Sequence, residues 1–242
     1  MRVENIILPS RGSTTAWDIR VEDGLVHTIQ ASQLAADHIK SNNVPSLLLP
    51  TLCQPHVHRD KPYILAGNHA PCSPVQPGHS DLTPRTGSFG EALTNTSKAK
   101  ERYTEQDLYL RGSQLLAASY GQNVTSLRGF VGLDHVTGNL PLVTALRLKK
   151  DFSYLMQVQM CAFAQDPLFS TAYGETNRSI IKAGLKDYAR SVDAFGTTPY
   201  VEQYTEASQQ NIEWAINTAL EYGLHLDSTW IITSVPSLSL GH

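Results

Sequence analysis

The sequence has little of what marks secreted, membrane-spanning or nucleic-acid-binding proteins. Its three cysteines, Cys53, Cys72 and Cys161, are odd in number and widely spaced, which argues against a disulfide framework. The apolar run at residues 47–49 is far too short to cross a bilayer, and no basic start followed by a long apolar core marks a signal peptide. We therefore expect a cytoplasmic protein without a membrane segment.

Charge is also sparse. Only 17% of the 242 residues are charged, and the formal net charge is -3, so no electrostatic feature favours nucleic acid or an anionic membrane as a partner. With 41% hydrophobic residues, the chain is long enough for one α/β barrel or for two small domains.

Residues 1–46 have the pattern of a small β unit. Residues 17–21 and 25–29 alternate as strands do, and Glu22, Asp23 and Gly24 between them form a turn signal. The sequence predicts a hairpin here.

After Pro45, strand-like and helical segments alternate. Helical patterns cover residues 89–97, 104–121, 140–150, 176–190 and 208–222, and strand-like patterns cover residues 46–52, 124–133, 154–163, 192–196 and 223–227. Thr104 and Asp107 predict an N-terminal cap for the second helix, and Gly121 predicts its end. The alternation favours βαβ units around a parallel sheet.

His56 and His58 are the residues with the clearest chemical potential. Residues two apart in an extended segment face the same side, and here they follow an apolar run, where an α/β barrel places its reactive groups. Neutral imidazoles bind zinc and iron. A chance pair of loop histidines, or a structural zinc site with Cys53, are the alternatives from spacing alone.

The longer string QPHVHRDK, residues 54–61, resembles the H-x-H-x-D-K signature of cytosine-deaminase-like amidohydrolases, including relatives that act on triazine rings. Four further segments, residues 17–29, 127–135, 157–166 and 196–202, resemble the family's N-terminal hairpin and its second, third and fourth barrel strands, in the right order. The resemblance implies an α/β fold, an incomplete TIM-type (β/α)8 barrel (about the first half) preceded by a small β-sandwich unit. It divides the chain into an N-terminal β unit (1–46), a half-barrel (47–227) and an unrelated tail (228–242).

The resemblance also implies roles for single residues. His56 and His58 are expected to bind one divalent metal, zinc or iron, Gln165 to hydrogen-bond the amide edge of a heterocyclic substrate, and Lys61 to stabilise negative charge. The implied reaction is the hydrolysis of a C–N bond, in which metal-activated water attacks a ring carbon that bears an amino group.

Each assignment has a structural alternative. Gln165 is also placed to cap the following turn, and Lys61 to be a solvated loop lysine. Arg128 and Asp134 are candidates for a structural ion pair. Glu202 is a candidate cap for the helix that follows it.

The family pattern ends at Asp227. Residues 224–227 (LHLD) match the start of the family's fifth strand, where His225 corresponds to a histidine that is not a ligand; the third histidine and the aspartate ligand have no counterpart afterwards. Three hypotheses follow: a deaminase or amidohydrolase acting on a cyclic amide or amidine such as cytosine; a truncated, inactive relative; or a half-barrel whose open edge recruits a partner, including a second copy as a homo-oligomer.

Overall fold

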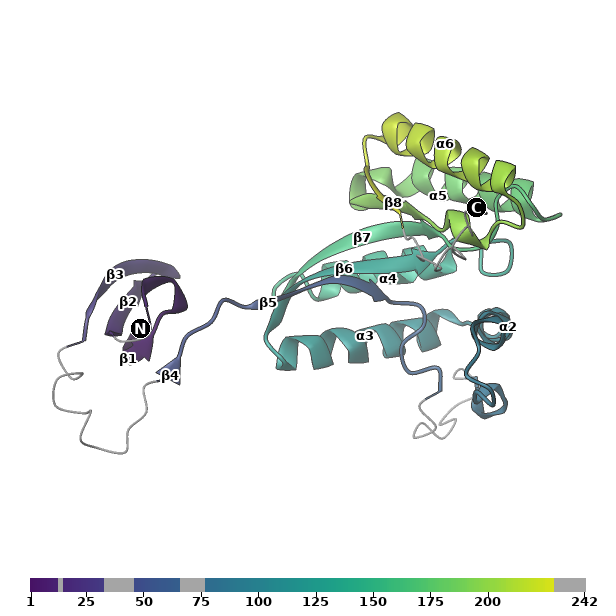
Figure 1. Ribbon diagram of the computed structural model, residues 1–242. Helices are drawn as coiled ribbons and strands as arrows, with labels where there is room; N and C mark the ends of the chain where they lie inside the picture. The colour runs from purple at the N-terminus through teal and green to yellow at the C-terminus, as the bar shows by residue number, and fades with distance from the viewer. Residues whose placement is uncertain (13–14, 33–45, 66–76, 229–242) are drawn as a thin grey trace, which may run out of the picture. The chain divides into compact units, whose positions relative to one another are not determined.

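The computed structural model describes residues 1–12, 15–32, 46–65 and 77–228 (Figure 1). Its contacts divide the chain into two compact units, Met1–Thr51 and Leu52–His242, and each is described by itself. Within the described residues, no helix is both long and apolar enough to cross a membrane. The predicted boundary at residue 46 stays a prediction, and the predicted tail lies, apart from Ser228, outside the described residues.

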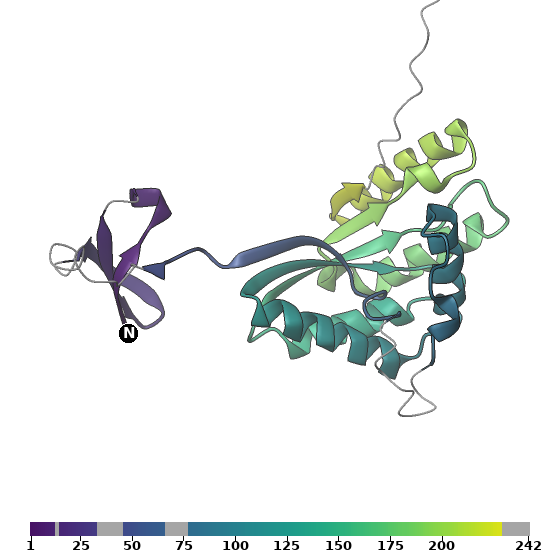
Figure 2. The same cartoon turned by 60° about the horizontal axis from the view of Figure 1, so that its bottom comes forward.

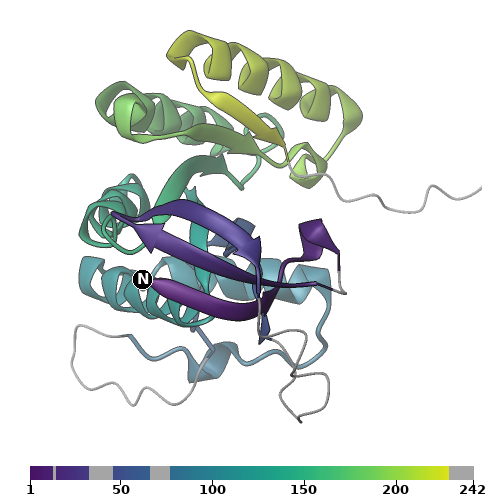
Figure 3. The ribbon, with the colours of Figure 1, turned by 90° about the vertical axis from the view of Figure 1, so that its left-hand side faces the viewer.

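The first unit is a four-stranded sheet with the order β3-β2-β1-β4, formed by β1 (Arg2–Ile7), β2 (Ala16–Glu22), β3 (Leu25–Ala31) and β4 (Ser46–Leu47) (Figure 3). The predicted hairpin is β2–β3. Asp23 (φ 50°) and Gly24 (φ 77°) both have positive φ, as tight hairpin turns between right-twisted strands require. The aspartate–glycine signal therefore identified the turn correctly.

The second unit is a curled parallel sheet with the order β5-β6-β7-β8-β9 (Figures 1 and 2). Its strands are β5 (Leu52–His58), β6 (Val124–Gly132), β7 (Gln157–Ala164), β8 (Ala194–Thr197) and β9 (His225–Ser228). Its described helices are α2 (Phe89–Lys100), α3 (Glu105–Gly121), α4 (Leu140–Asp151), α5 (Gly174–Tyr188) and α6 (Thr205–Tyr222). Its described 3-10 turns are Ser80–Leu82, Ala189–Ser191 and η4 (Pro199–Val201), and a further one, Pro9–Arg11, lies in the first unit. This arrangement confirms the prediction of half of a TIM-type barrel in one unit and a small sheet in the other.

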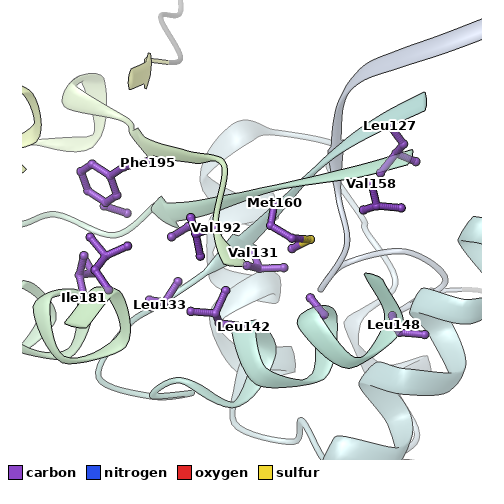
Figure 4. Close-up of a cluster of buried hydrophobic side chains, with 14 of the residues drawn as sticks. Leu127, Val131, Leu133, Leu142, Leu148, Val158, Met160, Ile181, Val192 and Phe195 are labelled. Atoms are coloured by element: carbon purple, nitrogen blue, oxygen red, sulfur yellow. The ribbon is translucent and has the colours of Figure 1, made fainter. Parts of the chain in front are cut away.

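The main core lies between the sheet and the helices that follow its strands (Figure 4). Val131, Met160 and Phe195 point from the strands toward Leu142 of α4 and Ile181 of α5, and all five are at most 1% exposed. This is the helix-covered face of the sheet.

The other face of the sheet has its own, smaller cluster. Phe130, Cys161, Phe163 and Ala194 alternate along the strands with residues of the main core, and all are at most 1% exposed. Because side chains alternate along a strand, these four residues define the inner face, which a closed barrel would enclose.

The prediction of one strand over residues 46–52 was wrong. Residues 46 and 47 belong to the small sheet, Leu48 and Leu49 are 40% and 59% exposed, and β5 begins only at Leu52 and itself contains the histidines. Pro50 has no backbone N–H for a strand ladder, so it interrupts the run.

Helix ends also differ from the prediction. The cap of α3 is as predicted, since the Thr104 hydroxyl accepts from the Asp107 N–H at 3.2 Å and the helix ends at Gly121. In contrast, α6 begins at Thr205, three residues before the predicted start, and its N-cap residue Tyr204 makes no side-chain cap that the sequence could have signalled.

Candidate functional site

Two histidines lie at the carboxyl end of β5. The rings of His56 and His58 have centroids 5.3 Å apart in an edge-on arrangement. His56 stacks on Phe130 of β6, with centroids 3.9 Å apart, and His58 meets Phe163 of β7 edge-on at 5.3 Å. The register of β5 against β6 shifts between Gln54 and Val57, yet both imidazoles lie against the inner-face phenylalanines.

His58 has the environment of a neutral imidazole. Burial, with the positive charge of Lys61 added to it, lowers the pKa of His58 to about 4. Its Nδ1 atom is buried without a hydrogen-bond partner. An unpartnered buried polar nitrogen is costly, and coordination of a metal would satisfy it.

Imidazole nitrogens are donors of the kind that divalent metals such as zinc and iron take. Among the described residues, no group of three or more histidine, cysteine or acidic side chains is placed to hold a metal ion. A catalytic zinc ordinarily takes three protein ligands and keeps one open position. The donors therefore suit a divalent metal in kind, and the described part of the chain provides two of them.

Lys61 and Gln165 meet beside the histidines. The Lys61 ammonium donates a hydrogen bond to Gln165 Oε1, although the two residues are separated by 104 positions in the chain. Burial lowers the pKa of Lys61, against the opposing effect of the Asp60 carboxylate. The structure thus brings together two residues that the sequence had singled out separately, and Lys61 is not a solvated lysine.

A buried ion cluster that the sequence analysis missed lies next to this pair. Lys100, the last residue of α2, places its Nζ 2.8 Å from Asp134 Oδ2 and 3.0 Å from each oxygen of Asp166. The side chains of Lys100 and Asp134 are 3% and 2% exposed, and that of Asp166 is 27% exposed. One ammonium therefore ties α2 to the ends of β6 and β7.

The pKa shifts in this cluster follow from its charges. Burial alone would disfavour the Lys100 cation, but Asp166 and Asp134 outweigh burial and raise its pKa. Burial likewise opposes ionisation of Asp134, and Lys100 outweighs it, so the pKa of Asp134 is lowered. A lysine at the end of an amphipathic helix gave no sequence signal, because its partners lie 34 and 66 residues away.

The suggested ion pair between Arg128 and Asp134 was wrong. Arg128 donates to Asp227 Oδ2 of β9 at 2.9 Å, and its Nε and Nη2 atoms donate to Gln159 Oε1 at 3.0 and 2.9 Å. Arg128 lies two residues before Phe130 on the inner face, while Asp134 lies beyond the strand end, where Lys100 is its partner. The two residues lie six positions apart along the extended chain, roughly 20 Å, and this distance separates the two groups.

The suggested role of Glu202 as a cap for the following helix was also wrong. Its carboxylate accepts backbone N–H bonds from Leu168 (2.7 Å) and Ser170 (3.0 Å), in the loop after β7. Asn211 of α6 donates to the same carboxylate at 2.8 Å. Glu202 therefore fastens the β7–α5 loop to α6.

Comparison with known proteins gives fold relatives only. The chain matches no family model and no curated protein sequence. It is similar to solved structures of 5-methylcytosine deaminase from Klebsiella pneumoniae, liganded with phosphonocytosine (TM-score 0.71, 20% identity) or 5-fluorocytosine (TM-score 0.72, 20% identity). It is also similar to N-isopropylammelide isopropylaminohydrolase from Burkholderia multivorans (TM-score 0.59, 17% identity).

The extent of these matches is uneven. Each covers 94% of this chain but only 50–52% of the other protein, so the chain spans about half the length of the solved structures it matches. At 17–20% sequence identity, these matches show that the chain shares the backbone fold of these proteins. The chain has an amidohydrolase-like fold.

Proposed function

We propose that the chain belongs to a metal-dependent hydrolase that acts on C–N bonds of a cyclic amide or amidine, such as cytosine or a related heterocycle. The observation that supports this most is the pair of imidazoles at the carboxyl end of β5, 5.3 Å apart, in the first strand of a half-barrel. The names of the fold relatives, a cytosine-type deaminase and an aminohydrolase, agree with it.

In this proposal His56 and His58 are two ligands of one divalent metal, zinc or iron, which when bound would supply water of lowered pKa. Gln165 binds the edge of the heterocycle. Lys61, whose ammonium lies against Gln165, provides positive charge at that edge.

A second candidate is a chain that keeps the fold but binds no metal and is catalytically inactive. The observation that favours it is the ligand count among the described residues, which falls short of the three that a catalytic zinc takes.

Three further assignments are part of the same proposal. The partner is a small molecule, since a net charge of -3 gives nucleic acid no electrostatic attraction. The protein is cytoplasmic. The chain divides into a β unit (1–46), a half-barrel (47–227) and an unrelated tail (228–242).

Metal content tests the proposal. We expect near-stoichiometric zinc or iron in the purified chain by elemental analysis after gel filtration, and its loss in a His56→Ala/His58→Ala double variant. His27→Ala is the matched control, because His27 is an exposed histidine of the other unit. It should leave the metal content unchanged.

The opposite result is equally clear. If the folded chain holds no more metal than the double variant, with folding checked by circular dichroism, the enzyme proposal is wrong and the inactive candidate stands. The elution volume in the same run reports whether two copies associate.

A further inference from the structure

A cavity of about 250 Å³ lies at the amino halves of β5, β6 and β7, whereas the two histidines lie at the carboxyl end of β5. Drug-sized ligands occupy roughly 300–1,000 Å³, so this cavity suits a smaller molecule. Among the described residues that line it, none is acidic. The side chains that bear on its chemistry come in pairs from the three strands: Cys53 and Pro55, Ser126 and Arg128, and Gln157 and Gln159.

The Arg128 guanidinium fixes the orientation of the Gln159 amide. Its Nε and Nη2 atoms both donate to Gln159 Oε1, at 3.0 and 2.9 Å. A guanidinium has donors and no acceptor, so the amide atom that faces it must be the oxygen. Nε2 of Gln159 is therefore a donor, and among the described residues it has no hydrogen-bond partner.

Arg128 keeps donors of its own for a ligand. A guanidinium carries five N–H groups. The contacts with Gln159 use two of them and the contact with Asp227 uses a third, so two are left. Asp227 belongs to β9, at the opposite edge of the sheet from β5, and does not line the cavity. The Arg128 side chain is 29% exposed, so a ligand in the cavity can reach it.

A site of this kind favours an anion with an apolar body. The free N–H groups of Arg128 and Gln159 are donors, and hydrogen bonds from a cation to a carboxylate are about twice as strong as those between neutral groups. Ser126 can either donate or accept, so it does not oppose an anion. Cys53 and Pro55 contribute apolar surface from β5.

We propose that this cavity is a binding site for a small monocarboxylate with an apolar body, held by Arg128 and by the Nε2 amide of Gln159. None of the contacts that carry this inference involves His56, His58 or a metal, so it is independent of the proposed function.

Benzoate and benzamide, titrated calorimetrically into the full-length chain, test the proposal. The two molecules have the same ring and nearly the same shape, but only benzoate is charged. We expect benzoate to bind at least about tenfold more tightly, a difference of about 1.4 kcal/mol. Equal binding of the two, or no binding of benzoate to the folded chain, would overturn the proposal.

Two isosteric substitutions should act in opposite directions. Gln159→Glu puts a carboxylate in the place of the amide, where it occupies Arg128, so the preference for benzoate should disappear. Asp227→Asn removes the other carboxylate and keeps an oxygen for the Arg128 N–H, so benzoate should bind about threefold more tightly or better. Loss of folding would weaken binding, so a gain in affinity cannot come from a damaged fold.

Arg190→Gln is the matched control, because Arg190 is an exposed arginine of the same unit. It should leave both dissociation constants unchanged. If the preference for benzoate survives Gln159→Glu, or if folded Asp227→Asn binds benzoate no more tightly than the unmodified chain, then Arg128 is not the group that binds the anion and the proposal is wrong.

Cys53 reports where the benzoate binds. It is an exposed cysteine in the wall of the cavity, whereas Cys161 is buried. Cys72 lies outside the described residues and is replaced by serine in this experiment. At a benzoate concentration ten times its dissociation constant, Cys53 should react about tenfold more slowly with a neutral dithiodipyridine reagent, because only the free site reacts. Benzoate binding that leaves the reaction rate of Cys53 unchanged would place the ligand elsewhere and overturn the proposed site.

Discussion

The two faces of the half-barrel sheet are built from different kinds of contact. On the helix-covered face, Phe195 packs edge-on against Trp214 of α6 at 5.7 Å, among aliphatic side chains. On the inner face, Phe130 is equally buried but stacks on the imidazole of His56 at 3.9 Å. The same residue type supports packing on one face and holds a polar ring on the other.

This difference separates what stabilises the fold from what the chain can do. Burial of aliphatic surface on the helix-covered face is non-directional and scales with area. At the strand ends the charged groups of Lys100 and Asp134 are buried and that of Lys61 is half-buried, and burial of such groups is tolerated because each has a specific partner. Substitutions should therefore change stability on both faces, but ligand-binding properties only on the inner one.

The largest effect is expected at the strand ends. Lys100→Met leaves two carboxylates without their cation, and removal of one partner of a buried pair costs about 3–5 kcal/mol. Unfolding by urea at pH 7 should show this loss, while Lys98→Met should unfold within about 0.5 kcal/mol of the unmodified chain.

The stability that Lys100→Met loses relative to the unmodified chain should depend on pH. The pKa of Asp134 is lowered in the folded chain, so its contribution is present above the ordinary aspartate value of about 3.9 and is lost as the pH falls through the lower folded value. The pKa of Lys100 is raised, so its contribution is complete below about 10.4 and is lost at higher pH. The difference in unfolding free energy between the unmodified chain and Lys100→Met should therefore become smaller below about pH 4. If this difference is unchanged at pH 3, Lys100→Met destabilises the chain through lost packing and not through lost charge.

The fold was accessible from the sequence because periodic patterns report burial on one face. The hairpin around Gly24, the cap at Thr104 and the alternation of strands and helices were all predicted, since each depends on residues close in the chain. The start of β5 was missed because the apolar run that contains Leu48 and Leu49 is exposed, and composition alone does not reveal that.

The partners of charged groups were the part that the sequence did not predict. Asp134 was matched with Arg128, which is close in the chain, whereas its partner is Lys100 on a preceding helix. Glu202 was assigned to the next helix, whereas it binds the loop at Leu168. The sequence around a carboxylate does not show which cation or N–H group it binds, because the tertiary structure determines that partner.

An intermediate effect is expected at Gly129, on the helix-covered side of β6. A Cβ atom there would overlap Cδ and Cγ of Arg59, which is 2% exposed and donates to the Ala145 carbonyl at 3.3 Å. Gly129→Ala should cost about 1–3 kcal/mol, as overpacking of a core does. Gly90→Ala, in α2 with open space around it, should be neutral or stabilise by up to about 1 kcal/mol.

The cause can be isolated with a double-mutant cycle. If Arg59 is what the new methyl group meets, Gly129→Ala should cost less in an Arg59→Ala background, with a coupling of about 1 kcal/mol measured by urea unfolding. If the unfolding free energies lost in the two single variants simply add in the double variant, the new methyl group meets a residue other than Arg59.

The smallest effect on stability gives the sharpest contrast between the faces. Phe130→Leu and Phe195→Leu each replace a fully buried ring with a somewhat smaller side chain, and each should cost about 1 kcal/mol. Only Phe130→Leu removes the ring on which His56 stacks, so only this variant should shift the His56 proton resonances in an NMR spectrum. Under the proposed function it should also weaken metal binding, while Phe195→Leu leaves it unchanged. Equal shifts of the His56 proton resonances in both variants would show that a change on the helix-covered face reaches the inner face. Packing on one face and ligand binding on the other would then not be independent.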